Sequence, residues 1–388
     1  METRYQRFGT TWLAATLAAI TGLALLNVLV DPAGAYPALH LRCFEPLRYV
    51  GLDRVTKAEM AGRGDWQVII LGSSRAETGL PAAHPFLATN RTCNLSFAAS
   101  RFPELAAAFD FAAKRNQLQH VILCVDLYMF SPGAPWIENF GESRFNPSLS
   151  LFPYYSKQIL GRACTDRTWD TLLRWIRGYR PAPQEARGFH SHGLDPTTSQ
   201  RELFGRVLRI LGAGYRKQAV DPEHLALFRH IVTVCRDQKI DLQVAIMPVH
   251  ALDLELLYAS GRWSEFEKWK SDLVKVLSDE GVEGRFNLWD FTGYAGPVAE
   301  TVPPEGDTRT RMNYYFENSH CTPVLGGMML DAMFGDGGTN AFGARLNRAN
   351  LQPHLAQILT NRTAYARTNA AEIQWVGRIL AESSASKK

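Results

Sequence analysis

Short apolar runs alternate with longer amphipathic segments along most of this chain, and the alternation predicts strands joined by helices. The runs predicted to be strands are Gln67–Gly72, Thr92–Phe97, His120–Leu127, Leu242–Met247 and Arg285–Trp289. The run at residues 121–125, Val-Ile-Leu-Cys-Val, is the clearest, because an uninterrupted apolar stretch indicates a strand buried on both faces.

Helices are predicted where apolar residues recur at helical spacing or where a proline follows a capping residue. These predicted helices are Pro81–Ala88, Pro103–Arg115, Trp169–Ile176, Glu202–Leu211, Pro222–Asp237, Ser264–Ser278, Pro323–Phe334 and Gln352–Ile379. Strands that alternate with helices form βαβ units. We therefore expect an α/β fold with an open, largely parallel, flavodoxin-like sheet of about five strands and helices on both faces.

The same pattern divides the chain into segments. Residues 65–338 hold the predicted α/β domain, and residues 131–220 form a long insertion between its third and fourth strands. Insertions at strand ends are often lids or binding loops, although an elaborated surface loop fits this composition equally well. Residues 31–64 are predicted to be a connector, and residues 339–388 a helical extension.

A charge-free apolar stretch runs from residue 11 to residue 30. Its length suffices to cross a bilayer as a helix, so we expect a transmembrane anchor there. Arg4 and Arg7 precede it, and the positive-inside rule then places residues 1–10 in the cytoplasm and the main body in the periplasm. A cleaved signal peptide is the alternative, since residues 33–35, Ala-Gly-Ala, fit a cleavage site. A buried helix of a soluble protein is a third reading.

Composition and charge exclude some classes of function. The net charge is +4 over 388 residues with no long basic run, so the chain lacks the electrostatic footprint of nucleic-acid binding. The six cysteines show no C-x-x-C spacing, and His190-Ser191-His192 has no carboxylate or cysteine partner at a suggestive spacing. We therefore expect neither a metal nor a cofactor. An even cysteine count outside the cytoplasm permits disulfides, whose pairing stays open.

Two short motifs at opposite ends of the α/β pattern carry the candidate chemistry. Residues 72–75 read Gly-Ser-Ser-Arg directly after the first predicted strand, where a small-residue turn exposes the hydroxyl of Ser74. Residues 317–320 read Glu-Asn-Ser-His after the last strand, so that Glu317 can orient His320 as a base. Together the motifs predict a triad of Ser74, His320 and Glu317 beyond the carboxyl ends of the strands.

These motifs resemble those of the SGNH (GDSL-like) hydrolase superfamily, in particular its membrane-anchored extracytoplasmic branch associated with acylation of cell-envelope polysaccharides. That superfamily carries its nucleophile in a Gly-Asp-Ser-like block on the first strand, and its acid and base in an Asp-x-x-His block near the C-terminus. Ser74 matches the nucleophile, with Ser73 in place of the aspartate, while Glu317 and His320 match the acid and the base. The resemblance covers about residues 60–335.

The G-x-S-x-G motif of α/β-hydrolases is a near match to the same residues. In that fold the nucleophile follows several strands, whereas Ser74 follows the first predicted strand, and Ala76 replaces the second glycine. The order of elements therefore favours the SGNH resemblance.

The middle blocks depart from the superfamily, in which a glycine and an asparagine complete the oxyanion hole. Residues 94–100 occupy the second block without a glycine, and Asp126 stands where the asparagine is expected. A carboxylate repels a developing oxyanion unless it is protonated or turned aside. Asn94 or Ser96 is the expected substitute donor. Arg75 is expected either to stabilise negative charge or to pair with Asp126 or another acid.

Two further residues end predicted strands at the same edge. His250 follows the fourth strand, where it is expected to line the pocket or to be a plain loop histidine. Asp290 ends the fifth strand and is an alternative to Glu317 as the acid.

The resemblance implies a periplasmic, membrane-anchored serine esterase or O-acyltransferase that acts on small acyl groups, acetyl in particular, of an envelope or exported polysaccharide. Water or a sugar hydroxyl can resolve the same acyl-enzyme, so hydrolysis and transfer both stay open. The alternative is a catalytically degenerate scaffold that binds glycan or docks on a membrane O-acyltransferase. Asp126 and the missing glycine favour the scaffold, whereas the intact triad favours the enzyme.

Overall fold

The computed structural model describes residues 2–48, 53–63, 65–182, 185–190, 193–216, 218–335 and 342–385. The chain forms two compact units, which we treat separately: unit 1 holds residues 1–63 and 138–188, and unit 2 holds residues 64–137 and 189–388. The expected insertion thus contributes to both units, and the expected connector lies almost wholly in unit 1. The expected boundary at residue 338 falls outside the described residues.

Unit 2 contains a six-stranded sheet in the order β2-β1-β3-β4-β5-β6. The strands are β1 (Val68–Leu71), β2 (Thr92–Asn94), β3 (His120–Val125), β4 (Asp241–Ile246), β5 (Asn287–Asp290) and β6 (Ala344–Leu346). The first five are parallel and β6 is antiparallel to β5. The predicted α/β class and mostly parallel sheet are confirmed, and the first five strands have the order of flavodoxin-like folds.

The expected number of strands, about five, is too low by one. β6 lies in the segment predicted to be a helical extension, and its sequence, Ala-Arg-Leu, has no alternation or apolar run that would indicate a strand. Its pairing with β5, in which Leu288 lies opposite Leu346, defines it. Tertiary pairing rather than local sequence therefore makes this strand.

Helices connect and cover the strands of unit 2. They are α3 (Ser74–Gly79), α4 (Pro85–Thr89), α5 (Phe102–Ala113), η2 (Leu127–Phe130), α8 (Gln200–Tyr215), α9 (Pro222–Asp237), α10 (Ala251–Ala259), α11 (Trp263–Asp279), η5 (Gly296–Ala299), α12 (Pro323–Phe334), α13 (Leu351–Thr368) and α14 (Ala370–Ala385). The predicted extension is thus largely helical apart from β6.

The order of the strands decides where the helices lie. The chain moves from β1 to β2 in one direction, then from β2 past β1 to β3 in the other. Because crossovers between parallel strands are right-handed, this reversal sends the later helices to the opposite face. Accordingly α5, α9 and α11 contact one another in series, while α12 packs against α3. The reversal creates a switch point between β1 and β3, where sheets of this kind bind ligands.

Glycines allow α12 to approach α3 closely. A Cβ atom on Gly326 would lie 1.9 Å from the carbonyl oxygen of Gly79, and one on Gly79 would lie 2.6 Å from Sγ of Cys321. Neither position accepts a side chain unless the backbone moves. Glycine at both positions therefore sets the spacing between α3, which begins at Ser74, and the start of α12 just after Cys321.

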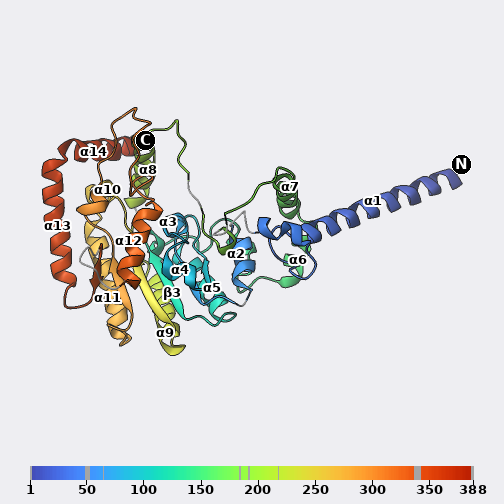
Figure 1. The fold of residues 1–388 in the computed structure, drawn as a ribbon, viewed down its shortest axis with the longest axis horizontal. Coiled ribbons are helices and arrows are strands. Elements are labelled where there is room, and N and C mark those ends of the chain that lie inside the picture. The colour runs from blue at the N-terminus through green and yellow to red at the C-terminus, as the bar shows by residue number, and fades with distance from the viewer. Residues whose placement is uncertain are drawn as a thin grey trace. The chain divides into compact units, whose positions relative to one another are not determined.

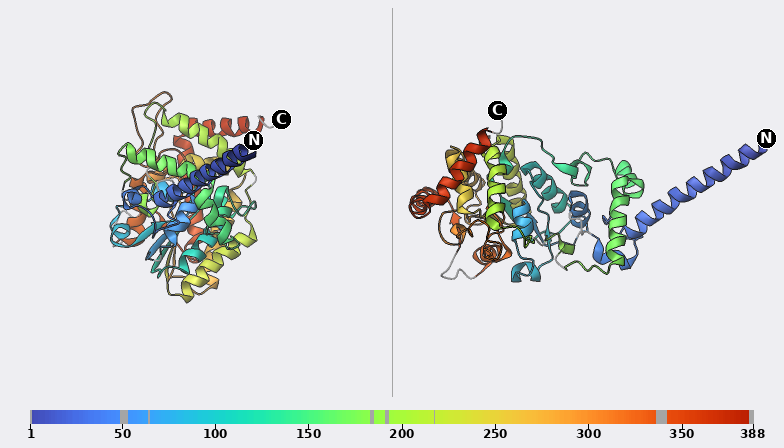
Figure 2. Two further views of the ribbon diagram at one scale, coloured as in Figure 1. Left: turned by 90° about the vertical axis from the view of Figure 1, so that its right-hand side faces the viewer. Right: turned by 90° about the horizontal axis from the view of Figure 1, so that it is seen from above.

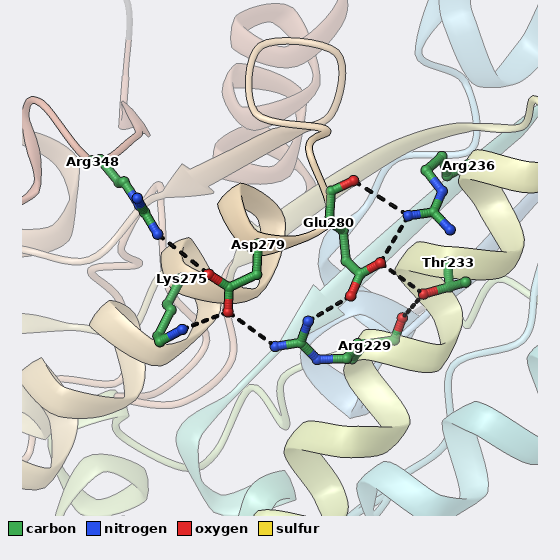
Figure 3. A network of polar contacts seen from close by, with 7 residues as sticks. All are labelled: Arg229, Thr233, Arg236, Lys275, Asp279, Glu280 and Arg348. Carbon is green, nitrogen blue, oxygen red and sulfur yellow. Dashed lines mark hydrogen bonds and ion pairs between the residues drawn. The ribbon is translucent and has the colours of Figure 1, made fainter.

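At the amino edge of the sheet, an ion-pair network joins α9 to the end of α11 (Figure 3). Glu280 binds two arginines of α9, Arg229 at 2.5 Å and Arg236 at 2.8 Å. Asp279 pairs with three cations, which are Lys275, Arg229 and Arg348. Because the network lies at the molecular surface, it is partly screened by water and salt.

Unit 1 is built around the C-terminal end of α1 (Glu2–Val30). Its other elements are η1 (Arg42–Leu47), α2 (Arg54–Ala61), η3 (Glu138–Glu142), α6 (Leu151–Leu160), α7 (Arg162–Ile176) and η4 (Glu185–Arg187). Among the described residues, Tyr5–Val30 is the one helical segment long and apolar enough to cross a membrane. This agrees with the predicted anchor.

The end of α1 is fixed by contacts within unit 1. α1 stops where Asp31 adopts a left-handed backbone with φ of 45° and its carboxylate binds Arg48 at 2.6 Å. Just before, the Asn27 side chain donates to the carbonyl of Ile159 in α6 at 2.8 Å and to Oγ1 of Thr165 in α7 at 3.1 Å. Both helices accordingly lie beside this end of α1 (Figures 1 and 2).

Candidate active site

The nucleophile motif lies in a tight turn at the end of β1. A Cβ atom on Gly72 would lie 2.8 Å from the Cβ atoms of Ala76 and Cys124, so only glycine permits this approach between β1, β3 and α3. Ser73 then caps α3, since its Oγ accepts from the N–H of Arg75. Ser74 follows as the first residue of α3, half-exposed at the carboxyl edge.

The acid and the base sit on a short loop closed by a β-bridge. Tyr315 pairs antiparallel with Cys321, and the N–H of Phe316 donates to the carbonyl of His320 at 2.9 Å. This closure holds Glu317 and His320 at the two ends of a single turn. α12 begins immediately afterwards, and its close contact with α3 carries the loop to the carboxyl edge of the sheet.

The structure brings the three predicted catalytic residues together. Oγ of Ser74 lies 2.7 Å from Nε2 of His320, and Nδ1 of His320 contacts Oε1 of Glu317. A carboxylate only accepts hydrogen bonds, so Nδ1 carries the proton and Nε2 is left to accept from the serine hydroxyl. The second oxygen of Glu317 accepts from the N–H of Ser319 at 2.7 Å, which fixes the carboxylate. This is the arrangement of a nucleophile, a base and an orienting acid.

Arg75 lies beneath the triad in a cluster of buried charge. Its guanidinium binds Asp126 at 2.5 Å and Asp253 at 3.4 Å, and its Nε donates to Oγ of Ser319 at 3.0 Å. Asp126 also accepts from Oγ of Ser73 at 2.8 Å. Of the two uses expected for Arg75, the structure thus shows the ion pair, and the carboxylate of Asp126 is turned toward this pair.

The charges of the cluster are coupled. Burial alone would lower the pKa of Arg75, but Asp126 and Asp253 hold that pKa well above its ordinary value. Burial raises the pKa of Asp253 to about 7, although the cation beside it opposes the shift. The Tyr215 hydroxyl donates to Asp253 at 2.7 Å, and burial raises the pKa of Tyr215 well above its ordinary range. Two acidic side chains, Asp126 and Asp253, therefore share the guanidinium of Arg75 in the protein interior, where water is excluded.

The expected oxyanion donors Asn94 and Ser96 are fully buried at the end of β2. The Asn94 amide donates to the carbonyl of Ala76 at 3.1 Å, and its oxygen accepts from the N–H of Ser96 at 3.0 Å. The first of these bonds joins β2 to α3, and the second is local to the end of β2. Farther along, the exposed Ala99 adopts a left-handed φ of 52°, a conformation that favours glycine.

His250 is buried completely and caps α10 rather than facing Ser74. Its Nδ1 accepts from the N–H of Leu252 at 3.2 Å, and its Nε2 donates to the carbonyl of Glu300 at 2.7 Å. Burial lowers its pKa to about 4, so the ring is neutral at ordinary pH. The backbone N–H of His250 donates to the carbonyl of Asn318 at 2.9 Å, and this bond supports the loop that carries Glu317 and His320.

Other candidates are engaged elsewhere. Asp290 binds Lys270 at 2.6 Å and His354 at 2.8 Å, apart from the triad. Among the described residues, no three histidine, cysteine or acidic side chains are arranged as metal ligands. Ser191 and His192 of the sequence His190-Ser191-His192 lie outside the described residues. All six cysteines are free thiols, of which five are buried and Cys43 is exposed.

A small cavity adjoins the charged cluster. It has a volume of about 30 Å³ and is lined by Arg75, Asp126 and Tyr215 together with apolar side chains. This space holds about one water molecule and is far too small for an ester or a sugar. Ser74 and His320 are not among the residues that line it, so this cavity is not a binding site for the substrate of the triad.

Two members of the charged cluster, Asp253 and Tyr215, cannot be identified as partners of Arg75 from the sequence. Asp253 lies on α10, a helix that the apolar pattern does not predict, and Tyr215 ends α8 within the expected insertion. Nothing in the local sequence of either residue points to Arg75. The sequence offers one signal for them. Arg75 directly follows the nucleophile, and an arginine that is buried there needs acidic partners nearby.

Comparison with known protein families and with curated proteins finds no match to this chain. The case for a function therefore rests on the geometry of the site.

Proposed function

We propose that unit 2 is an acyl-transferring serine enzyme of the SGNH type, an esterase or an O-acyltransferase. The observation that carries this proposal is the 2.7 Å contact between Oγ of Ser74 and Nε2 of His320, with Glu317 on the other ring nitrogen. The carboxyl edge beside the β1–β3 switch point is where an α/β sheet of this order binds its ligand.

In the proposed reaction, Oγ of Ser74 attacks an acyl carbonyl while Nε2 of His320 takes the hydroxyl proton. Glu317 stabilises the imidazolium that forms. When the tetrahedral intermediate collapses, the bond to the leaving alkoxide breaks and His320 gives it the proton, which leaves an acyl-Ser74. Water or a sugar hydroxyl then loses its proton to His320 and attacks the acyl carbonyl. When this second intermediate collapses, the bond between the acyl carbon and Oγ breaks, and His320 returns the proton to Ser74.

The oxyanion needs donors that Asp126 does not provide. Its carboxylate is held by Arg75 and Ser73, which removes the expected repulsion from the site of the developing charge. We assign the donor role to the backbone N–H of Ser74 and to a backbone N–H in the turn at Ala99, two segments that both adjoin Gly72. The carbonyl of Gly72 accepts from the N–H of Phe97 and from Oγ of Ser100, each at 3.0 Å, and this fixes the turn in place.

The substrate class and the location follow from the resemblance and from α1. We infer that α1 anchors the protein with residues 1–10 in the cytoplasm, because Arg4 and Arg7 precede the apolar stretch. The catalytic unit then faces the periplasm. The substrate proposed there is an acylated, most simply acetylated, envelope or exported polysaccharide. The triad mechanism itself uses no metal or cofactor.

The test is turnover of p-nitrophenyl acetate by the full chain in detergent, with acid-quenched samples digested and searched for an acetyl group. We expect turnover and acetyl on the peptide that contains Ser74, both abolished in Ser74→Ala. Absence of turnover and of acetylation in a folded wild type would reject the enzyme. That result would favour the scaffold reading, in which the same edge binds glycan or a membrane O-acyltransferase.

A further inference from the structure

In helix α7 of unit 1, the large apolar side chains lie on the solvent-exposed face rather than on the buried face. Its buried face carries Cys164, Thr168 and Thr171, which are small or polar. Its outward face carries Trp169 and Ile176, with Leu173 between them, and these side chains are 54%, 71% and 45% exposed. They recur at helical spacing, so they form one continuous apolar stripe. A helix whose most apolar stripe faces outward is built to contact something other than water.

The preceding helix α6 also exposes large apolar side chains. Phe152 is 83% exposed, and Leu151 and Leu160 are 55% and 50% exposed, whereas the residues it buries are Tyr154 and Gln158. Single exposed apolar residues are normal on any protein surface. Several large ones gathered on two consecutive helices mark an interaction surface. We use the name apolar face of unit 1 for six of the exposed apolar side chains of α6 and α7, which are Leu151, Phe152, Leu160, Trp169, Leu173 and Ile176.

The contacts with α1 show at which depth this face lies. From Phe8 to Val30 the helix carries no charge, and at about 1.5 Å per residue this stretch slightly exceeds the roughly 30 Å hydrocarbon core of a bilayer. α6 and α7 pack on its last two turns, where Asn27 bonds to both. A helix pair attached there lies at the boundary between hydrocarbon and head groups.

The charge of the segment fits such a surface. Residues 151–180 contain six basic and two acidic residues, a net charge of +4 that equals the net charge of the whole chain. Arg177 and Arg180 follow α7, next to the exposed Ile176 and the partly exposed Tyr179. Apolar and aromatic side chains beside a basic cluster are typical of helices that lie in an anionic membrane interface.

We propose that the apolar face of unit 1 lies in the interface of the bilayer that α1 spans, with Phe152, Trp169 and Ile176 among the acyl chains. The basic residues of 151–180 then meet anionic lipid head groups. Three helices then hold unit 1 on the membrane: α1 spans the bilayer, and α6 and α7 lie in its interface. The inference rests on the membrane anchoring proposed above and is independent of the chemistry at Ser74.

The test uses the full chain in vesicles of phosphatidylcholine and phosphatidylglycerol in equal amounts. In a Cys43→Ser background the five remaining native thiols are buried. Single cysteines are introduced as Phe152→Cys and Ile176→Cys and labelled with a polarity-sensitive fluorophore. The matched control is Ile210→Cys, because Ile210 is an apolar side chain of α8 in unit 2 with 66% exposure, close to the 71% of Ile176. A label at Leu17→Cys reports whether α1 is inserted.

The expected result is a blue-shifted emission at positions 152 and 176, with most of it lost to a nitroxide carried on the lipid and little to aqueous iodide. The label at Ile210→Cys should show the reverse. Quenching at 152 and 176 by iodide alone would overturn the proposal, as would protection from both quenchers, which would mean that protein covers the face. A Leu17→Cys label that stays in water would overturn the anchor and this inference with it, while leaving esterase activity untouched.

Discussion

Unit 2 carries two clusters of charged side chains at opposite edges of one sheet, and they differ in their access to water. At the carboxyl edge, Arg75 binds Asp126 and Asp253 in the interior, and each of these three residues is at most 6% exposed. At the amino edge, Arg229 and its partners Asp279 and Glu280 form a larger network at the surface (Figure 3). Ion pairs are strong where water is excluded and weak where it is present.

The difference teaches that the number of ion pairs does not indicate their role. The surface network joins two neighbouring helices, α9 and α11. The buried cluster instead connects the turn that carries Ser74, the end of β3 and the loop that carries His320, since Arg75 also binds Ser319. Its members fix positions at the site where a displacement of a fraction of an ångström changes reactivity.

The largest expected effect separates the two serines of the motif. Ser74→Ala removes the nucleophile and should lower turnover of an aryl acetate by about 10⁴-fold or more, without loss of stability. Ser73→Ala removes the cap of α3 and a hydrogen bond to Asp126 but keeps the triad. It should cost about 1 kcal/mol of unfolding free energy and much less activity. Steady-state rates and urea unfolding of both variants check this, and equal rate losses would contradict it.

The next largest effect concerns the buried cluster itself. Asp126→Ala takes one acid from Arg75 and leaves buried charge less well compensated, so the free energy of unfolding should fall by about 3–5 kcal/mol. The loop that carries Glu317 and His320 should also become more mobile, because Arg75 donates a hydrogen bond to Ser319 in that loop. Chemical denaturation measures the first effect and amide hydrogen exchange at residues 317–320 measures the second. A loss no larger than that from a surface ion pair would contradict the contrast drawn here.

The pH dependence of stability follows from two buried groups that act in opposite directions. The pKa of Asp253 is raised to about 7, so the folded state holds its proton more tightly and stability falls as pH rises from about 4 to 7. The pKa of His250 is lowered to about 4, so its contribution is present above about 6.5 and is lost as pH falls toward 4. The two slopes offset each other in the wild type between about pH 4 and 6.5.

Asp253→Asn removes the first slope and should reveal the second. In this variant the free energy of unfolding is expected to rise with pH between about 4 and 6.5 more steeply than in the wild type. His250→Asn should show the opposite trend, with stability that falls as pH rises through the same window. Urea unfolding at a series of pH values checks both, and superimposable profiles for the three proteins would show that neither group titrates as described.

The smallest effect is expected at the surface network. Asp279→Asn loses its pairing with Lys275, Arg229 and Arg348, yet its effect on the midpoint of urea unfolding should be several times smaller than that of Asp126→Ala. The small effect should shrink further in high salt, since surface charges are screened. A loss as large as that of Asp126→Ala would break the comparison between the two edges.

Local sequence predicts those features of this molecule that depend on interactions between residues close together in the chain. The strand-like segments of the sequence predict all five parallel strands, most clearly β1 and β3, whose apolar runs are uninterrupted because both strands are buried. Ser74, Glu317 and His320 likewise stand in motifs of a few residues each. β6 is not predicted, because its pairing with β5 rather than its own pattern makes it a strand.

The parts of the site that depend on distant contacts are beyond such reasoning. Arg75 reaches Asp253 across 178 positions of sequence and Ser319 across 244. Sequence suggests that Arg75 pairs with an acid, but not that two acids share it. His250 has the position of a pocket residue at a strand end, yet the packing of Phe204 and Tyr315 edge-on against its ring places it in the interior.

The central claim is that Ser74 is activated by His320, and reaction with a fluorophosphonate probe tests it without knowledge of the substrate. The purified full chain, Ser74→Ala, His320→Ala and Ser73→Ala are treated with the probe, and the modified residue is mapped by mass spectrometry. We expect a single modified residue, Ser74, in the wild type and in Ser73→Ala, and no modification in the other two. A folded wild type that does not react, or reaction at Ser74 that persists in His320→Ala, would contradict it.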